Sequence, residues 1–202
     1  MKKATQTPKF TVREPRQARS RLKVELMLEA TIRILEKEGM TGLTTNAIAA
    51  KAGISIGTVY QFFPNKETIL DALAEREMAQ LSARILAVMS NEAIASAGER
   101  VAAVVRAVTT SYGRRSKAHR LVIVHSLTRG INRLPPLMAH LQDHLLSERS
   151  SGQFKKPVSA GDAFVIPYAI LGVLRGMINE ATAPPREEIE RSLTRLIVSA
   201  LA

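Results

Sequence analysis

Residues 43–67 read LTTNAIAAKAGISIGTVYQFFPNKE, and this stretch decides the fold. Two threonines precede an alanine-rich run, and a hydroxyl at such a position accepts hydrogen bonds from the free N–H groups of a helix start. Gly53 can adopt the left-handed conformation that ends a helix, and Ser55 is a suitable cap for another. The stretch therefore predicts a short helix over residues 46–52, a tight turn, and a second short helix over residues 56–62.

Two short helices joined by such a turn form a helix-turn-helix. Ile48 and Ala49 of the first helix can pack against Val59 of the second, and the neighbouring alanines permit a close crossing. The second helix can then place its N-terminal residues in the major groove of DNA. The pattern is of moderate specificity by itself, because short helix-turn-helix motifs arise often by chance.

The remaining sequence is also predicted to be helical. Apolar residues at helical spacing predict a helix over residues 16–39 and a long helix over residues 66–89. No strand pattern or internal repeat is found, and only 4% of the residues are aromatic, which disfavours a sheet. We therefore predict an all-α protein. Five further helices are expected over residues 99–112, 117–128, 134–148, 160–181 and 187–201.

Positive charge is concentrated at the N-terminus. The protein has a net charge of +11, and residues 1–23 carry eight Lys or Arg against the single acid Glu14. Residues 24–66 are neutral, with four basic and four acidic side chains. A basic arm before a neutral segment indicates a polyanion partner, either nucleic acid or an anionic membrane surface. A solvated tail is the alternative.

Composition and motifs exclude several functions. The absence of Cys excludes disulfide frameworks, thiolate metal sites and thiol nucleophiles. The longest uncharged apolar run, residues 163–174, contains Pro167 and is shorter than the roughly 20 residues that span a membrane. No span and no secretory signal are therefore expected, and we predict a cytoplasmic, nucleoid-associated protein without a membrane partner.

No catalytic, cofactor or metal site is predicted. Common catalytic and nucleotide-binding motifs are absent, so no enzyme activity has a residue to rest on. His140 and His144 have a spacing that can bind a metal from one helix face, but two histidines without a third ligand are weak evidence. A structural or solvent-facing role is expected for both.

The longer sequence context closely resembles the TetR family of bacterial transcriptional regulators. The resemblance rests on residues 27–39, 43–49 and 52–70 and extends without a gap over about residues 20–72. It implies a homodimeric, ligand-responsive regulator, most often a repressor, that a small molecule releases from a palindromic operator in double-stranded DNA. Two alternatives are a DNA-binding structural protein without an effector, and an enzyme or carrier that uses the helical domain.

The resemblance also implies a domain organisation. Residues 1–15 form a basic arm predicted to be disordered. Residues 16–66 form a three-helix DNA-binding domain that contains the helix-turn-helix. Residues 67–202 form a larger helical domain for ligand binding and dimerisation, and such a long segment argues against a purely structural DNA-binding protein.

Three residues are assigned to the DNA backbone by the resemblance. Thr45 opens the second helix of the family and contacts phosphate, Tyr60 hydrogen-bonds the backbone, and Lys66 pairs with phosphate. Hydroxyls and N–H groups at a helix N-terminus suit an anion. Two alternatives remain, in which Thr44 and Thr45 act only as caps and Tyr60 belongs to the core.

Base readout is expected from the exposed side of the second short helix. Gln61 can pair with adenine, and Ile56 or the methyl group of Thr58 can contact a thymine methyl. Gly57 costs helix stability and would allow the backbone to approach DNA. The predicted DNA-binding residues are Thr44, Thr45, Asn46, Ser55, Ile56, Gly57, Thr58, Tyr60, Gln61 and Lys66.

The helical domain is expected to enclose an apolar pocket with a few polar groups. Residues 100–142 hold eight basic and no acidic side chains, which suits a surface facing DNA, an anion-friendly pocket or a solvated face. The candidate lining residues are larger or polar residues on mostly apolar helices: Tyr112, His125, Arg129, Tyr168 and Met177.

Dimerisation is expected to use the last two helices. Residues 160–181 are apolar nearly all round, which predicts burial on most sides. Ala169, Gly172 and Gly176 form a stripe of small residues that permits close approach of another helix. In the TetR family the last two helices form a four-helix interface, to which Leu193 and Ile197 would contribute. The alternative is a core within one chain.

Overall fold

The structure is a computed structural model that describes residues 16–94, 96–110, 116–128, 135–147, 158–180 and 182–201. The described residues form nine helices and no strand, so the all-α prediction is confirmed. The predicted arm, residues 1–15, lies outside the described residues. The helices are α1 (Arg16–Glu38), α2 (Thr45–Ala52), α3 (Ile56–Phe62), α4 (Lys66–Met89), α5 (Ala97–Thr109), α6 (Ser116–Thr128), α7 (Pro135–Ser147), α8 (Ala160–Asn179) and α9 (Arg186–Leu201).

Helix boundaries agree with the sequence predictions to within three residues. α1 ends before Gly39, which has φ 73° as a left-handed stop requires. The largest shift is in α5, which begins two residues and ends three residues earlier than predicted. Ser96 explains the early start, because its Oγ accepts a hydrogen bond from Glu99 N at 3.1 Å and so caps the helix.

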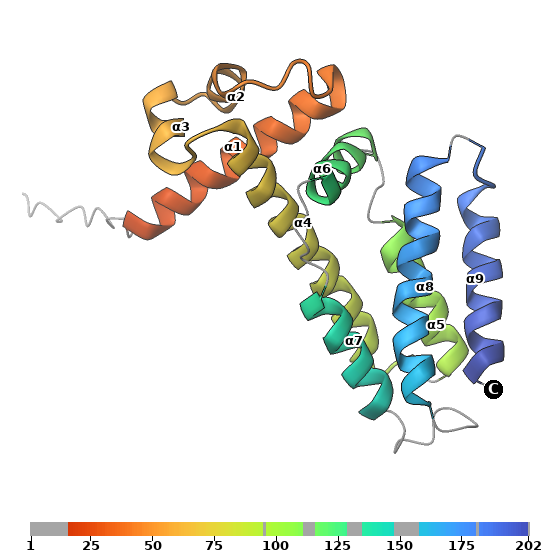
Figure 1. The fold of residues 1–202 in the computed structure, drawn as a ribbon. Helices are drawn as coiled ribbons and strands as arrows, with labels where there is room; N and C mark the ends of the chain where they lie inside the picture. Colours follow the sequence, from red (N-terminus) through yellow and green to blue (C-terminus); the bar gives the residue numbers. More distant parts are fainter. Residues whose placement is uncertain are drawn as a thin grey trace, which may run out of the picture.

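The N-terminal core joins α1, α2 and α3 to the helices that follow. Its buried members include Leu35, Ile48 and Val59, and α4 contributes Ile69 and Leu70. The core therefore extends past residue 66, and the predicted domain boundary at that residue stays a prediction. Figure 1 shows these three helices at one end of the molecule and α4 running from them towards the C-terminal helices.

The C-terminal helices pack around α5. α5 contacts α4, α8 and α9, and α7 packs on α8. α8 and α9 lie side by side at the edge of the molecule farthest from α4 (Figure 1). α6 packs against both α1 and α4, where Ala118 N donates a hydrogen bond to Glu36 Oε2 at 2.9 Å. α6 thus connects the N-terminal helices to the rest of the chain.

α8 has the length and composition of a membrane-spanning helix. The window Ala160–Met177 has a mean hydropathy of 1.3, and only 22% of it is buried. The sequence expectation considers only the uninterrupted apolar run, whereas this helix meets a criterion of length and composition alone, so the absence of a membrane span stays a prediction. The window extends that run by including Asp162 and Arg175 near its two ends. Within the single chain α8 is therefore not buried on most sides, and the predicted burial would require a partner.

Candidate nucleic-acid interface and ligand cavity

Local caps build the turn between α2 and α3. Thr44 Oγ1 accepts a hydrogen bond from Ala47 N at 3.0 Å, and Ser55 Oγ accepts one from Thr58 N at 3.1 Å. Gly53 lies between the two helices with φ 68°. The predicted caps and the predicted left-handed glycine are therefore present, and they set the two helices at a fixed angle.

The buried side of the motif holds the two helices together. Ile48 and Val59 are fully buried, and Ala49 and Phe63 belong to the same cluster. This is the packing predicted for the helix-turn-helix. With Val59 and Phe63 facing inward, the other side of α3 faces outward.

Two hydroxyl groups meet on the outer surface of the motif. Thr45 Oγ1 and Tyr60 OH lie 3.3 Å apart, within hydrogen-bonding distance. Tyr60 is 55% exposed, so the alternative that placed it in the core was wrong. Lys66 begins α4, where Asn65 Oδ1 accepts a hydrogen bond from Thr68 N at 2.9 Å. Each of these hydroxyl and ammonium groups can donate to a phosphate oxygen.

The outward face of α3 carries the residues predicted to contact bases. Ile56, Gly57 and Gln61 are exposed, and Thr58 is half-buried with its hydroxyl 2.9 Å from Ser55 Oγ. Because the hydroxyl group of Thr58 is used in that contact, its methyl group is the part of the side chain best suited to contact a base. All ten residues predicted to bind DNA are exposed or half-buried. Their contact with DNA stays a prediction.

The sequence between the end of α1 and the start of α4 contains no acidic residue. From Gly39 to Lys66 the only charged side chains are the two lysines, Lys51 and Lys66. A surface without carboxylates does not repel phosphate, and helix N-termini add partial positive charge. The charge of this segment is therefore compatible with an anionic partner.

Gly57 is not required by the fold. A Cβ at this position would meet only Ser55 Oγ, at 3.9 Å, and the backbone φ of Gly57 is not positive. A glycine inside a helix costs about 1 kcal/mol relative to alanine. The missing side chain leaves the backbone open to close approach by another molecule at this position.

We therefore expect Gly57→Ala to have opposite effects on stability and on DNA affinity. The free energy of unfolding should rise by up to about 1 kcal/mol, whereas the affinity for DNA should fall because the methyl group occupies the contact surface. Thermal unfolding and fluorescence anisotropy measure the two quantities. Gly98→Ala, where a Cβ would meet Val198 Cγ2 at 3.8 Å, is the matched control and should leave DNA affinity unchanged. If the DNA affinity of Gly57→Ala is unchanged, the first turn of α3 does not contact DNA.

An ion-pair network joins α1 to α4. Arg76 of α4 contacts Glu25 at 2.8 Å and Glu29 at 3.1 Å on α1, and Glu77 at 3.0 Å on its own helix. Burial opposes the charge of Arg76, but hydrogen bonds to Glu25 and Glu77 outweigh burial and raise its pKa. His119 of α6 lies 2.9 Å from Glu77. Three helices therefore meet at one charged cluster.

The same cluster makes stability depend on pH. Burial raises the pKa of Glu77, but hydrogen bonds from His119 and Arg76 outweigh it and hold the pKa below its usual value. A carboxylate with a lowered pKa stabilises the folded state above its unfolded pKa, about 4.5, and the contribution is lost as the pH falls through the folded pKa. Acid should therefore loosen the α1–α4–α6 junction.

Glu77→Gln should flatten this acid dependence. In urea unfolding, the wild-type protein should lose more free energy of unfolding between about pH 7 and about pH 3 than the variant does. Glu92→Gln, in the exposed turn after α4, is the control and should behave as the wild type. An identical loss in wild type and Glu77→Gln would show that the carboxylate of Glu77 does not carry the effect.

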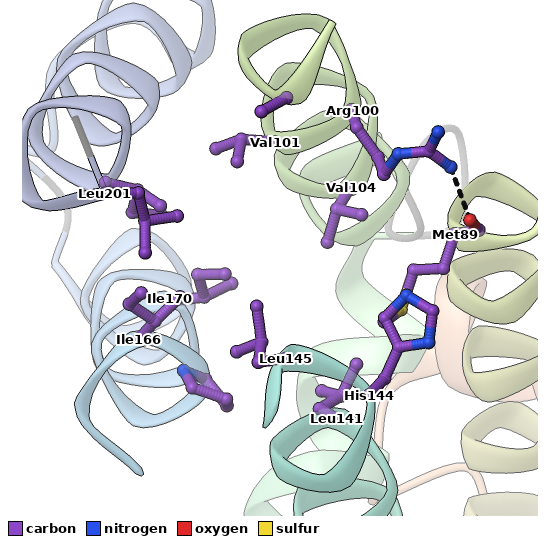
Figure 2. A pocket seen from close by; sticks show the side chains of 13 residues that line it. Met89, Arg100, Val101, Val104, Leu141, His144, Leu145, Ile166, Ile170 and Leu201 are labelled. Atoms are coloured by element: carbon purple, nitrogen blue, oxygen red, sulfur yellow. Dashed lines mark hydrogen bonds between the residues drawn. The ribbon is translucent and has the colours of Figure 1, made fainter. Parts of the chain in front are cut away.

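The C-terminal helices line an apolar cavity that is partly open to solvent, which we call the first cavity (Figure 2). Its walls come from α5, α7, α8 and α9 and from the end of α4. Among its lining residues the only polar side chains are Arg100 and His144, and no acidic residue is present. The lining residues are Met89, Ala97, Arg100, Val101, Val104, Leu141, His144, Leu145, Ile166, Pro167, Ile170, Ile197 and Leu201.

A second cavity adjoins the first. All its lining residues are apolar, and four of them, Val104, Leu141, Pro167 and Ile170, also line the first cavity. It reaches α4 at Leu81 and Ile85. An apolar lining with a few polar groups is typical of small-molecule sites. The apolar pocket predicted from the sequence is thus present as two adjoining cavities.

Three of the residues predicted to line the pocket, His125, Tyr168 and Met177, are not among the lining residues of either cavity. His125 instead lies 3.1 Å from Asp71 and joins α6 to α4, and Tyr168 is exposed on the outer side of α8. Met177 is half-buried but contributes to neither cavity. A role of these three residues in ligand binding stays a prediction. Tyr112 and Arg129 lie outside the described residues.

Arg100 and His144 are the lining residues that the sequence prediction missed. In the sequence His144 is notable only for its spacing from His140, and Arg100 only as one of eight basic residues in residues 100–142. The available signal was the position of Arg100 beside Val101 and Val104, because an arginine on the apolar side of a helix is buried with it. No group of three or more His, Cys, Asp or Glu residues that could hold a metal occurs in the part of the chain that the structure describes.

The small-residue stripe of α8 faces away from the protein. Ala169 and Gly172 are exposed, and Gly176 is half-buried. A Cβ at Gly172 would meet nothing within 4 Å. On the same helix Phe164 and Tyr168 are exposed, with their rings stacked at a centroid distance of 4.7 Å. This side of α8 is available to a partner.

Leu193 and Ile197 belong to the core of the chain. Each is only 5% exposed, and both lie in a cluster with Val105 of α5. Their assignment to a dimer interface is therefore corrected, because α5 already covers them. The exposed apolar residue of α9 is Leu196, at 65%. It lies on a different side of the same helix.

The N-terminal helices match a known family. The model of the family described as "Bacterial regulatory proteins, tetR family" matches residues 27–73. Tetracycline repressor protein class D of Escherichia coli is 39% identical over 61 residues, which are 30% of this chain and 28% of that protein. Nucleoid occlusion factor SlmA of Haemophilus influenzae is 34% identical over 88 residues, 43% of this chain and 38% of that protein.

Most of the chain resembles solved structures in its fold. The transcriptional regulator FadR from Bacillus subtilis, solved in complex with stearoyl-CoA, superposes with a TM-score of 0.67 over 88% of this chain and 99% of that chain. The sequence identity is 22%, so this likeness concerns the fold alone. The two curated relatives are matched over 28% and 38% of their own lengths.

Proposed function

We propose that this chain, whose residues 27–73 match the TetR family of bacterial regulatory proteins, is a homodimeric transcriptional repressor controlled by a small molecule. The dimer binds a near-palindromic operator through α3 and releases it when a ligand occupies the C-terminal cavities. The proposal includes no enzymatic activity, no metal and no cofactor. Such a regulator acts in the bacterial cytoplasm, where the DNA is.

The observation that carries the DNA-binding part is the outward face of the helix-turn-helix. Gln61 and Ile56 are exposed on α3, and Gly57 leaves the backbone bare where the fold does not need it. Thr45, Tyr60 and Lys66 lie around this face as donors for phosphate. Phosphate contacts position a protein on DNA, and contacts to base edges supply the sequence preference.

Dimerisation is supported by the uncovered side of α8. Phe164, Val165 and Tyr168 are exposed there, and Leu196 of α9 is exposed as well. Large apolar side chains grouped on one surface favour a protein interface. A two-fold interface is self-complementary, and stacking two copies of α8 and α9 would cover all four residues in both protomers. Gly172 would allow the two α8 helices to approach closely.

The two cavities support control by a ligand. α4 begins at Lys66, beside the DNA-binding residues, and carries Leu81 and Ile85 in the wall of the second cavity. A ligand changes DNA binding only if it binds one conformation better than the other. A molecule that displaces α4 would shift α1 through Arg76 and so misplace α3 relative to its partner. A DNA-binding structural protein would need no such cavities.

Transcription from a promoter that carries the operator tests the proposed function. The operator is first identified by selection with the purified protein and placed before a reporter gene. Expression of the protein should reduce reporter output, and Gln61→Ala should restore it. Increased output on expression would make the protein an activator. Unchanged output with the operator occupied would favour the structural role.

A further inference from the structure

We infer that the two cavities form one elongated site for an amphipathic anion: an unbranched hydrocarbon chain with an acidic head group. The chain would extend from the first cavity into the second, and the head group would lie at the Arg100 end. Only the effect of the ligand on DNA binding rests on the proposed function. Binding of the ligand to the protein is inferred from the cavities alone.

The shape of the combined site favours a long chain. The two cavities lie next to each other and share a wall formed by Val104, Leu141, Pro167 and Ile170. The second cavity has only apolar lining residues. A polar group placed there would lose its hydrogen bonds to water without replacement. The inner part of the ligand must therefore be hydrocarbon.

Charge places the head group in the first cavity. In Figure 2 Arg100 and His144 lie on the α4 side, while Ile166, Ile170 and Leu201 lie opposite. The Arg100 guanidinium donates hydrogen bonds to the carbonyl oxygens of Met89 and Ile94, and its buried Nε has no hydrogen-bond partner.

Arg100 keeps an uncompensated positive charge. No ion pair joins it to a carboxylate among the described residues, and the first cavity has no acidic lining residue. An anionic head group near Arg100 would gain a charge-assisted hydrogen bond, whereas a cationic one would be repelled. The anion is therefore the favoured head group for this chain.

The test uses ligands rather than a variant of Arg100, because Arg100 also caps the end of α4. Octanoate, decanoate and dodecanoate are titrated into the full-length protein by calorimetry without DNA, below their micelle concentrations. Affinity should rise about fourfold for each added methylene, the factor expected for transfer of hydrocarbon out of water. Decyltrimethylammonium, with an equal chain and the opposite charge, should bind at least about tenfold more weakly than decanoate.

Val104→Phe tests the continuity of the site. Val104 lines both cavities and is half-buried, so a larger side chain should close the passage between them. Octanoate should bind within about twofold of its wild-type affinity, and the gain from longer chains should disappear. Val124→Phe, on the exposed side of α6, is the control and should keep the gain.

Three results would overturn the inference: no binding of any carboxylate, equal or tighter binding of the cation, or an undiminished gain for dodecanoate in Val104→Phe. Release of DNA is measured separately by anisotropy with the selected operator. Binding that grows with chain length but leaves the operator occupied would support the inference and contradict the proposed control of DNA binding. If a different compound releases the operator and no carboxylate binds, the inference is contradicted and the proposed control of DNA binding is supported.

Discussion

Gly172→Arg is expected to convert the dimer into monomers and to abolish specific DNA binding. Gly172 is exposed on α8 and a Cβ there meets nothing within 4 Å, so the arginine fits the folded chain. In the proposed dimer the same position faces the other copy, where a bulky charge would be buried without a partner. Sedimentation velocity measures the oligomeric state.

Loss of the dimer should lower operator affinity by roughly 10²–10⁴-fold, because the second half-site is then no longer bound at a high effective concentration. Ala87→Arg, on the exposed side of α4, is the control and should remain dimeric with normal affinity. An unchanged dimer in Gly172→Arg would place the interface elsewhere than on α8. Unfolding of the variant is checked by circular dichroism, and is not expected at so open a site.

The second prediction with a large effect distinguishes a residue that contributes sequence specificity from one that contributes affinity for any DNA. Gln61→Ala should cost about 1–3 kcal/mol on the preferred operator and little on other sequences, because a lost base contact affects one operator position. Lys66→Ala should weaken binding about equally on all sequences and reduce the salt dependence by about 1 for each protomer, because a phosphate contact is lost.

Anisotropy titrations at several salt concentrations, on the selected operator and on an unrelated duplex, distinguish these two outcomes. Lys51→Ala is the control, because Lys51 is an exposed lysine on α2, whereas Lys66 begins α4. A uniform loss in Gln61→Ala, or a loss confined to the operator in Lys66→Ala, would exchange the proposed roles of the two residues.

The helices and the turn could be predicted because their signals are local. Thr44, Gly53 and Ser55 act on backbone groups within a few residues of themselves, and each takes the role that its chemistry indicates. The same holds for Asn65 at the start of α4. Val59 could be assigned to the core because its spacing from Phe63 repeats the helical period.

The partners of each apolar face could not be predicted from local signals. Leu193 and Ile197 lie on an apolar stripe that suits a second protomer as well as α5, and only the tertiary packing decides for α5. Pocket residues were sought among large or polar side chains, but His125 is used in a contact with Asp71. Arg100 was overlooked because sequence alone does not show that its guanidinium folds back onto the end of α4.

Selection of DNA from a pool of random duplexes by the purified full-length protein tests the central claim most directly. The account predicts enrichment of an inverted repeat whose two half-sites lie about 34–36 Å apart, one helical turn or a multiple of it, as two recognition helices of a dimer require. Enrichment of an unpaired single site, or of no sequence at all, would contradict it.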